Sequence, residues 1–205
     1  MCTNGCVLYR KRSTIDSHAN IFRVVDRLVL VNGLPGAGKT TLATALAGAL
    51  PATLVSKDAI KEALATTVVG ASPVALGAAA MEAAWTLTAA IDGTIVFDSW
   101  WFKPRDLRYA EAGIRRAGHP TVIEVWCDVP VHLARGRYEA RRRSGDRAAA
   151  IHGDGSDRSD DAADAWTDWV ARGEPLGIVP TLHVNTERPV DVERVARQVL
   201  DALHG

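Results

Sequence analysis

Cysteine is scarce in this sequence. Only Cys2, Cys6 and Cys127 occur among its 205 residues. Three thiols at these spacings provide neither the paired framework of a disulfide-rich protein nor the close pairs that are typical of a metal site. The scarcity therefore excludes a fold built on disulfides, and we expect a protein of the reducing cytoplasm.

Charge of one sign is not in excess either. The chain has 24 basic and 24 acidic residues, so its formal net charge is zero. Proteins that follow a nucleic-acid backbone or lie on an acidic membrane usually carry a basic surface. The balance of charges argues against both kinds of partner.

The sequence has no long hydrophobic run. Its N-terminus lacks the apolar stretch of a signal peptide. Residues 63–81 carry no charge, but Gly70, Pro73 and Gly77 interrupt them. A membrane-spanning helix needs about 20 consecutive, predominantly apolar residues. We therefore expect two buried helices in this region and no membrane span.

The composition that remains is that of an ordinary globular protein. Apolar residues make up 47% of the chain, and a chain of this length is sufficient for one domain with a full core. Residues 1–20 are polar and show no periodicity. We expect a flexible N-terminal tail over 1–20 and a single domain over 21–205.

One motif stands out in the expected domain. Residues 33–40, GLPGAGKT, match the phosphate-binding pattern G-x-x-x-x-G-K-S/T at each fixed position. An apolar run from Leu28 to Val31 precedes the motif, and helix-forming residues follow it as far as about Leu50. A buried strand, a glycine loop and a helix in this order are the context that a nucleotide-binding P-loop requires.

The residue types of this loop suit a polyphosphate. Glycines leave the backbone N–H groups uncovered, so these groups can surround the phosphates, and the start of the next helix directs its dipole at them. Lys39 brings a positive charge to the β- and γ-phosphates, and the Thr40 hydroxyl is placed for Mg²⁺. The expected cofactors are ATP and Mg²⁺. The expected nucleotide-binding residues are Gly33, Leu34, Pro35, Gly36, Ala37, Gly38, Lys39, Thr40 and Thr41.

Strand and helix patterns alternate along the rest of the chain. The alternation predicts an α/β protein with the three-layer P-loop NTPase fold, in which helices cover both faces of a five-stranded parallel sheet. The expected strands are 28–32, 52–55, 94–97, 122–127 and 181–184, and the expected helices are 39–50, 59–65, 73–91, 106–117, 130–143, 162–171 and 190–203. Right-handed crossovers place the carboxyl ends of all strands at one edge, where ligands bind.

Two carboxylates follow strands at that edge. Asp98 ends the third expected strand and resembles the acid that holds Mg²⁺ beside the Thr40 hydroxyl. Asp58 follows the second strand, at the side of the sheet beyond Asp98. It is the candidate general base for an acceptor hydroxyl, and it can also cap the next helix. Lys61 lies one turn further along the same helix face and is a candidate for binding the acceptor.

Arginines are concentrated near the expected helix 130–143. The cluster consists of Arg135, Arg137, Arg141, Arg142, Arg143 and Arg147. Arg137 and Arg141 share one helix face, and arginines that close over a transferring phosphoryl group stabilise its charge. With the polar loop 144–160, they predict a small arginine-bearing lid over about 137–160. A solvated basic face is the alternative.

Two adjacent tryptophans, Trp100 and Trp101, directly follow Ser99 and Asp98. Neighbouring side chains of this size cannot both face the core easily, so at least one of them is expected to wall the acceptor pocket. Packing against helix 73–91 is the alternative. These two tryptophans and Arg105 complete the candidate acceptor-binding residues.

Taken together, the motifs resemble those of a group of small P-loop kinases. The group includes the kinase domain of phage polynucleotide kinase, the chloramphenicol phosphotransferases and the zeta-toxin kinases. The matching stretches are GLPGAGKTTLA (33–43), SKDAIKEAL (56–64), IVFDSWWFKPRDLR (95–108) and CDVPVHLARGRYEARRRSGDR (127–147). The resemblance implies a kinase, and it implies no particular substrate because acceptors vary widely within the group.

The resemblance also implies roles for single residues. Asp58 falls on the general base of the N-R-D-x-x-R segment in the phage kinase, and Lys61 falls on its arginine, which is a departure from that pattern. Asp98 falls on an aspartate that ends the third strand. Arg137 and Arg141 fall on arginines of the lid helix, the second of which contacts phosphate. The chain also lacks the Arg-His-Pro-x-His lid sequence of many relatives.

These observations predict an ATP-dependent phosphotransferase that acts on a hydroxyl of a small molecule such as an antibiotic, a sugar or a nucleoside. One alternative is a 5′-hydroxyl polynucleotide kinase, against which the neutral net charge weighs. The other is a nucleotide-binding switch without transfer activity, against which Asp58 and the arginine cluster weigh. The sequence specifies neither the acceptor, nor ATP over GTP, nor the oligomeric state.

Overall fold

The structure is a computed structural model that describes residues 25–143 and 159–204. The expected N-terminal tail and most of the loop in the expected lid lie outside the described residues. Within the part of the chain that is described, no helix has the length and apolar character needed to span a membrane.

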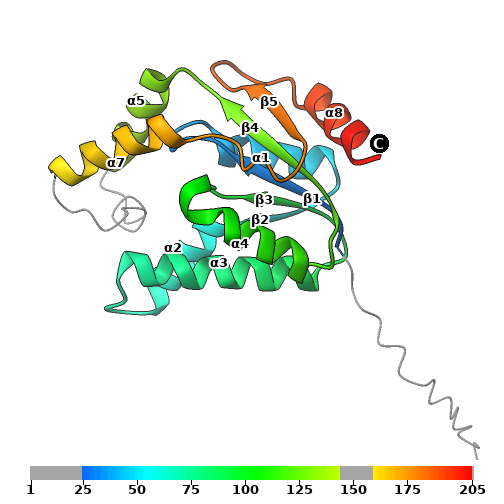
Figure 1. The fold of residues 1–205 in the computed structure, drawn as a ribbon, viewed down its shortest axis with the longest axis horizontal. Coiled ribbons are helices and arrows are strands. Elements are labelled where there is room, and N and C mark those ends of the chain that lie inside the picture. Colours follow the sequence, from blue (N-terminus) through cyan, green and yellow to red (C-terminus); the bar gives the residue numbers. More distant parts are fainter. Residues whose placement is uncertain (1–24, 144–158, 205) are drawn as a thin grey trace, which may run out of the picture.

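A sheet of five parallel strands forms the centre of the molecule (Figure 1). The strands are β1 (Val25–Asn32), β2 (Thr53–Ser56), β3 (Gly93–Asp98), β4 (Thr121–Asp128) and β5 (Thr181–Asn185). Their order across the sheet is β2-β3-β1-β4-β5. The expected fold is confirmed, and the strand that carries the loop lies in the middle of the sheet with β3 and β4 beside it.

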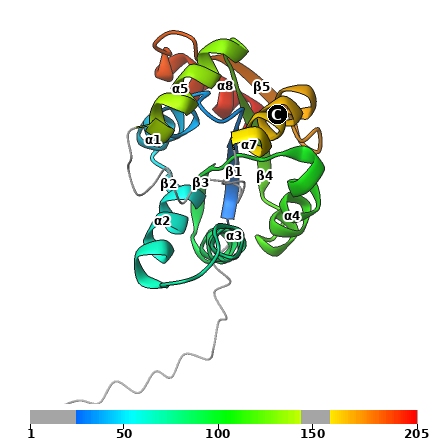
Figure 2. The same cartoon turned by 90° about the vertical axis from the view of Figure 1, so that its left-hand side faces the viewer.

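Helices cover both faces of this sheet (Figure 1). The helices in the described residues are α1 (Lys39–Ala49), α2 (Lys57–Thr67), α3 (Pro73–Ala90), α4 (Lys103–Arg116), α5 (Val131–Arg143), α7 (Ser159–Arg172) and α8 (Val192–His204). Helices α1 and α8 lie on one face, and α3 and α4 lie on the other. Figure 2 views the molecule from the side toward which the arrow of β4 points, with α1 and α5 above the strand ends and α2 and α3 below them.

The strand β1 separates two apolar cores. Successive side chains of a strand point to opposite faces, so Val29 and Val31 pack in the core with α1 and α8. Leu28 and Leu30 pack in the other core, which also contains Trp85 of α3. Burial on both faces explains why the sequence of β1 is a continuous apolar run and does not alternate.

The structure corrects three local expectations. The helix α2 begins at Lys57, and its N-cap is Ser56, whose hydroxyl accepts from the Ala59 N–H at 3.4 Å. Asp58 is therefore in the first turn and is not the cap. The region 63–81 does form two helices, but α2 is largely half-exposed and its one buried residue is Lys61.

Candidate active site

The glycine loop has the backbone shape that its sequence predicts. Gly33, Gly36 and Gly38 have φ angles of 141°, 84° and 85°, a region that side chains other than glycine rarely adopt. Gly38 is the N-cap of α1. A Cβ at Gly36 would collide with the backbone carbonyl of Ala134 in α5. The loop therefore lies directly against α5, with no room for a side chain between them.

Lys39 is buried under this loop. Its Nζ donates to the backbone oxygens of Gly33 and Leu34, both at 2.9 Å, and lies 5.6 Å from the centre of the Trp100 ring. Burial lowers the pKa of the Lys39 ammonium, and the attraction of Asp98 opposes this change. The lysine head is thus fixed at the carboxyl end of β1, which is where the sequence predicts a phosphate.

Charged groups from other elements surround Lys39. Asp98 at the end of β3 and Asp58 in α2 both stabilise its positive charge, whereas Arg141 of α5 opposes it. Burial raises the pKa of the nearby Cys127 thiol to about 12, so that thiol is neutral near pH 7. The structure therefore brings three of the charged residues predicted from sequence to the same lysine.

Asp98 is almost completely buried. Its Oδ2 accepts from the Ser56 hydroxyl at 3.2 Å. Burial raises the pKa of Asp98, and hydrogen bonding from the Thr40 side chain and the attraction of Lys39 oppose that rise. Carboxylate and hydroxyl oxygens are hard donors of the kind that Mg²⁺ prefers, and Mg²⁺ usually needs few protein ligands because water and phosphate supply the others. The oxygens of Asp98, Thr40 and Ser56 fit that ion.

Asp58 is in a different environment from Asp98. Its side chain is 40% exposed, and Oδ1 accepts from Lys57 Nζ at 3.2 Å. Because Ser56 caps the helix, the carboxylate of Asp58 is not needed for that task. Its exposure leaves it within reach of a molecule that approaches from solvent.

Lys61 is buried beside α3. Its Nζ lies 3.8 Å from the position that a Cβ would occupy at Gly77. The small residue in α3 makes room for the long side chain of α2. The sequence places Lys61 on the same helix face as Asp58, and the structure adds that its head packs against α3.

The two arginines on the predicted lid face contact different partners. Arg137 donates to the backbone oxygens of Thr186 and Glu187, at 3.3 and 3.1 Å. These residues follow β5, so Arg137 ties α5 to the loop between β5 and α8. Arg141 lies one turn further along and interacts electrostatically with Lys39. Of these two arginines, Arg141 is the one that the structure brings into the charged group around Lys39.

The two adjacent tryptophans lie in different environments. Trp101 is fully buried and packs against Phe97 and Trp85, with ring centres 4.9 and 5.7 Å away. It belongs to the core, so it does not wall an acceptor pocket. Trp100 lies over Lys39 and contacts the rings of Phe102 and Trp169. Trp100 is therefore the one of the pair that lies beside the phosphate loop.

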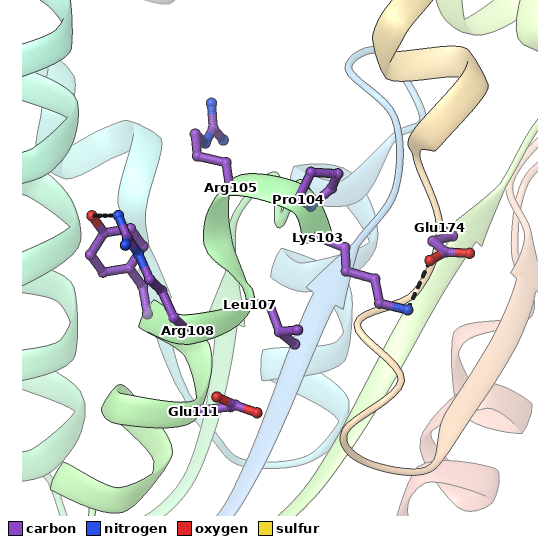
Figure 3. A pocket seen from close by; sticks show the side chains of 8 residues that line it. Lys103, Pro104, Arg105, Leu107, Arg108, Glu111 and Glu174 are labelled. Atoms are coloured by element: carbon purple, nitrogen blue, oxygen red, sulfur yellow. Dashed lines mark hydrogen bonds and ion pairs between the residues drawn. The ribbon is translucent and has the colours of Figure 1, made fainter.

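Arg105 lies at the start of α4, where it lines a hollow of about 720 Å³ (Figure 3). The lining residues are Lys103, Pro104, Arg105, Leu107, Arg108, Tyr109, Glu111 and Glu174. None of them belongs to the loop 33–40. Arg105 donates from Nε and Nη2 to the two oxygens of Asp106, both at 2.7 Å. The structure therefore does not place Arg105 with the charged group around Lys39.

Sequence reasoning missed two buried polar residues behind the loop. Asn32, the last residue of β1, accepts from the Gly33 N–H at 2.7 Å and donates to Oε1 of Glu124 at 2.7 Å. Both side chains are fully buried. The signal for Glu124 was a single carboxylate within the apolar run of β4, since an acidic residue is rarely buried without partners.

An aromatic group on α7 was also missed. Trp166 stacks on Tyr138 of α5, and Trp169 contacts both Tyr138 and Trp100. These rings connect α5, α7 and the segment after β3. Helix-spaced aromatic residues in 162–171 were the available signal, and their partners could be known only from the fold.

Solved structures with the same architecture include several kinases. A candidate kinase from Chloroflexus aurantiacus J-10-fl shares 27% identity at a TM-score of 0.69, over 86% of this chain and 98% of that one. The Mycobacterium tuberculosis APS kinase CysC, in complex with AMPPNP and APS, has 20% identity and a TM-score of 0.57, over 87% and 98%. Chaetomium thermophilum Kti12, in complex with ADP-AlF3, has 20% identity and a TM-score of 0.59, over 87% and 100%.

Sequence comparison identifies the family. Among curated proteins, none matches this chain. The family model described as AAA domain matches residues 28–172, a range that begins in β1, includes the glycine loop and ends with α7. This match covers more than half of the chain, and with the P-loop fold around Lys39 it shows that the protein belongs to the AAA domain family.

Proposed function

We propose that the protein is an ATP-dependent phosphotransferase that moves the γ-phosphate of ATP to a hydroxyl of a small molecule. The observation that carries the proposal is the set of charged residues around Lys39. Asp98, Asp58 and Arg141 come from three different elements and all interact electrostatically with Lys39. A protein that only binds nucleotide needs the loop and Lys39, whereas a transferase also needs groups for the acceptor and for the transferring phosphoryl group.

The glycine loop would hold the phosphates of ATP. Its backbone N–H groups and the N-terminus of α1 favour an anion at the end of β1. The ammonium of Lys39 has three N–H donors, two of which are directed at Gly33 and Leu34 in the loop. These bonds hold the lysine head at the loop, where its charge is available to the β- and γ-phosphates.

A magnesium ion would be held beside Asp98. The oxygens of Thr40, Asp98 and Ser56 described above are the groups that suit it, and the ion would neutralise charge on the β- and γ-phosphate oxygens. Magnesium as cofactor is part of this proposal.

Asp58 would serve as the general base. The acceptor oxygen attacks the γ-phosphorus, its proton passes to the Asp58 carboxylate, and the bond to the bridging oxygen breaks, so that ADP leaves. Arg141 would stabilise negative charge on the transferring phosphoryl oxygens. Lys61 and Trp100 would line the approach of the acceptor, from α2 and from the segment after β3.

A small-molecule acceptor is proposed because the net charge of the chain is zero. A polynucleotide acceptor would require many phosphate contacts, which demand a basic surface. An antibiotic, a sugar and a nucleoside all provide a suitable hydroxyl. The proposal also includes a cytoplasmic location, the N-terminal tail over 1–20, the single domain over 21–205 and the lid over about 137–160.

A screen of hydroxyl compounds with ATP and Mg²⁺ tests this function. Thermal shift in the presence of an ATP analogue selects candidates, and transfer of the γ-phosphate to the candidate is then measured directly. We expect transfer by the wild type and none by Lys39→Ala, which should remain folded because burial makes the Lys39 charge unfavourable in the folded state. Normal transfer by Lys39→Ala would contradict the proposed function.

A further inference from the structure

Behind the phosphate loop lies a continuous buried polar chain, which the proposed catalytic roles do not use. It consists of Asn32 at the end of β1 and Glu124 in the middle of β4, with the groups bonded to them. Both side chains have no exposed surface. Burying a carboxylate and an amide is costly unless each polar atom is paired. The hydrogen-bond partners of Asn32 and Glu124 therefore indicate which parts of the fold these two residues hold together.

Asn32 joins the phosphate loop to the segment after β3. Its Oδ1 accepts from Gly33 N at 2.7 Å and from Trp101 N at 3.0 Å. Its Nδ2 donates to the Trp101 backbone oxygen at 3.1 Å. One amide side chain thus fixes both the first peptide of the loop and the peptide that directly follows Trp100.

Glu124 joins this amide to the segment between α7 and β5. Its Oε1 accepts from Asn32 Nδ2 at 2.7 Å, and its Oε2 accepts from the Leu176 N–H at 2.9 Å. The Thr181 side chain and the Gly177 backbone are further partners. Burial raises the pKa of Glu124, and these bonds oppose that rise, because all of the groups donate, as an ionised carboxylate requires. The chain of bonds therefore runs from Gly33 to Leu176.

The phosphate loop and α7 are also connected through the ring of Trp100. The Trp100 ring contacts Trp169 of α7 at 6.5 Å between ring centres and lies beside Lys39. The helix α7 ends at Arg172, shortly before Leu176. The phosphate loop and the region at the end of α7 are therefore connected by both the buried bonds and the aromatic contacts.

We propose that Asn32 and Glu124 are positioning residues that couple the phosphate loop to the segment 174–181 after α7, so that nucleotide binding and the placement of α7 depend on each other. The inference rests on the proposed function, because it assumes that a nucleotide occupies the loop. Both side chains are buried behind the loop, so neither would touch a nucleotide bound there. Asn32 and Glu124 act through the Gly33 peptide and through the Leu176 peptide.

The donors and acceptors of this pair suggest a test by exchange. Glu124→Gln places an NH₂ group against either the Asn32 amide or the Leu176 N–H, both of which are donors. Asn32→Asp places an oxygen against Oε1 of Glu124, which is an acceptor. In the double variant the new amide at position 124 can donate to the new carboxylate at position 32, while its oxygen accepts from the Leu176 N–H. The double variant therefore restores the bond between the two side chains, although the Trp101 oxygen still loses its donor.

Amide hydrogen exchange with and without a non-hydrolysable ATP analogue and Mg²⁺ measures the coupling. In the wild type we expect the analogue to slow exchange at residues 174–181. In Glu124→Gln this slowing should disappear, and the affinity for the analogue should fall about ten-fold or more, since small misplacements of binding groups are costly. The double variant should regain part of the slowing at 174–181 and part of the affinity for the analogue. A general loss of stability would not produce this recovery.

Glu174→Gln is the matched control. It removes a carboxylate from the same segment, but its partner is Lys103 on the surface, at 2.8 Å. It should keep the wild-type slowing and affinity. If the wild type binds the analogue without any change of exchange at 174–181, the coupling is wrong and the proposed function stands. If the wild type binds no analogue, both are overturned.

Discussion

Asp58 and Asp98 are two carboxylates near one lysine that lie in different environments. Asp98 is 2% exposed, and the hydroxyl groups of Ser56 and Thr40 hold its oxygens. Asp58 is half-exposed on α2. A general base must reach a proton on a molecule arriving from solvent, and a metal-site carboxylate need not. The difference in burial supports Asp58 as base and Asp98 as metal-site residue.

Asparagine substitutions test these two proposed roles. We expect Asp58→Asn to bind the nucleotide with Mg²⁺ almost normally and to lower kcat by about 10²–10⁴-fold, the usual range for a lost acid–base group. Asp98→Asn should raise the Mg²⁺ concentration needed for activity. Measuring kcat across a Mg²⁺ titration distinguishes them. Normal turnover by Asp58→Asn, with Asp98→Asn inactive at saturating Mg²⁺, would reverse the assignment.

Arg141 and Arg137 should also behave differently. Arg141→Ala should lower kcat by roughly 10²-fold and leave ATP affinity nearly unchanged, because stabilisation of the transferring group matters mainly in the transition state. Arg137→Ala removes the bonds to Thr186 and Glu187, so we expect it to act mainly through the stability of that loop. Steady-state measurements of kcat and of the KM for ATP with both variants distinguish these two effects. A change confined to the KM for ATP in Arg141→Ala would contradict a role in transfer.

At the scale of elements, contact between α5 and the glycine loop is the feature that sequence patterns did not indicate. A Cβ at Gly36 would meet the Ala134 carbonyl and lie near the Tyr138 nitrogen. We expect Gly36→Ala to shift the loop or α5 and to weaken ATP-analogue binding about 10²-fold or more, since a misplacement of about 1 Å has effects of that size. Isothermal titration calorimetry measures the change.

Gly48→Ala provides the comparison for that variant. Gly48 lies in α1, and apart from its chain neighbours and the nearby backbone of α1 no described atom lies within 4 Å of the Cβ position. Alanine there should stabilise the helix by about 0.5–1 kcal/mol and leave analogue binding unchanged. If Gly36→Ala binds the analogue as well as Gly48→Ala does, close contact with α5 is not required for phosphate binding.

The elements themselves were predictable because their patterns are local. The apolar run of β1 and the glycines after it specify strand and loop, and each expected strand overlaps an observed one. The cap of α2 was assigned wrongly because Ser56 and Asp58 both satisfy the capping preference, and only the backbone shows that Ser56 has the cap position. The length of β1 was underestimated because its first residues include the polar Asp26 and Arg27.

The candidate site was predictable in its loop and in its acidic residues, since both directly follow strands. The partners of long side chains were not predictable. Arg137 and Arg141 share a helix face in sequence, yet the first reaches the loop after β5 and the second approaches Lys39. The side chains of Trp100 and Trp101 alternate in direction, as those of neighbours in an extended segment do. Which of them faces the core depends on the position of Trp85.

At the scale of the whole molecule, two buried charges of the candidate site affect stability. Burial lowers the pKa of Lys39 and raises the pKa of Asp98, so both charged forms are less favourable in the folded state than in the unfolded chain. The shift of Asp98 already includes the attraction of Lys39. Two charges that would be placed for catalysis therefore reduce stability near neutral pH.

Asp98→Asn should consequently raise the melting temperature near pH 7, although it removes a carboxylate from the proposed magnesium site. The folded state of the wild type retains a proton on Asp98 to higher pH than the unfolded chain does, so this residue lowers stability as pH rises above about 4, the ordinary pKa of aspartate. Asparagine removes that loss and can still accept from the Ser56 hydroxyl. The gain should be complete above the raised pKa of Asp98 and should shrink as the pH falls toward about 4. Calorimetric melting of both proteins across this range measures it, and an equal or lower melting temperature for Asp98→Asn at pH 7 would show that the ionised carboxylate stabilises the fold.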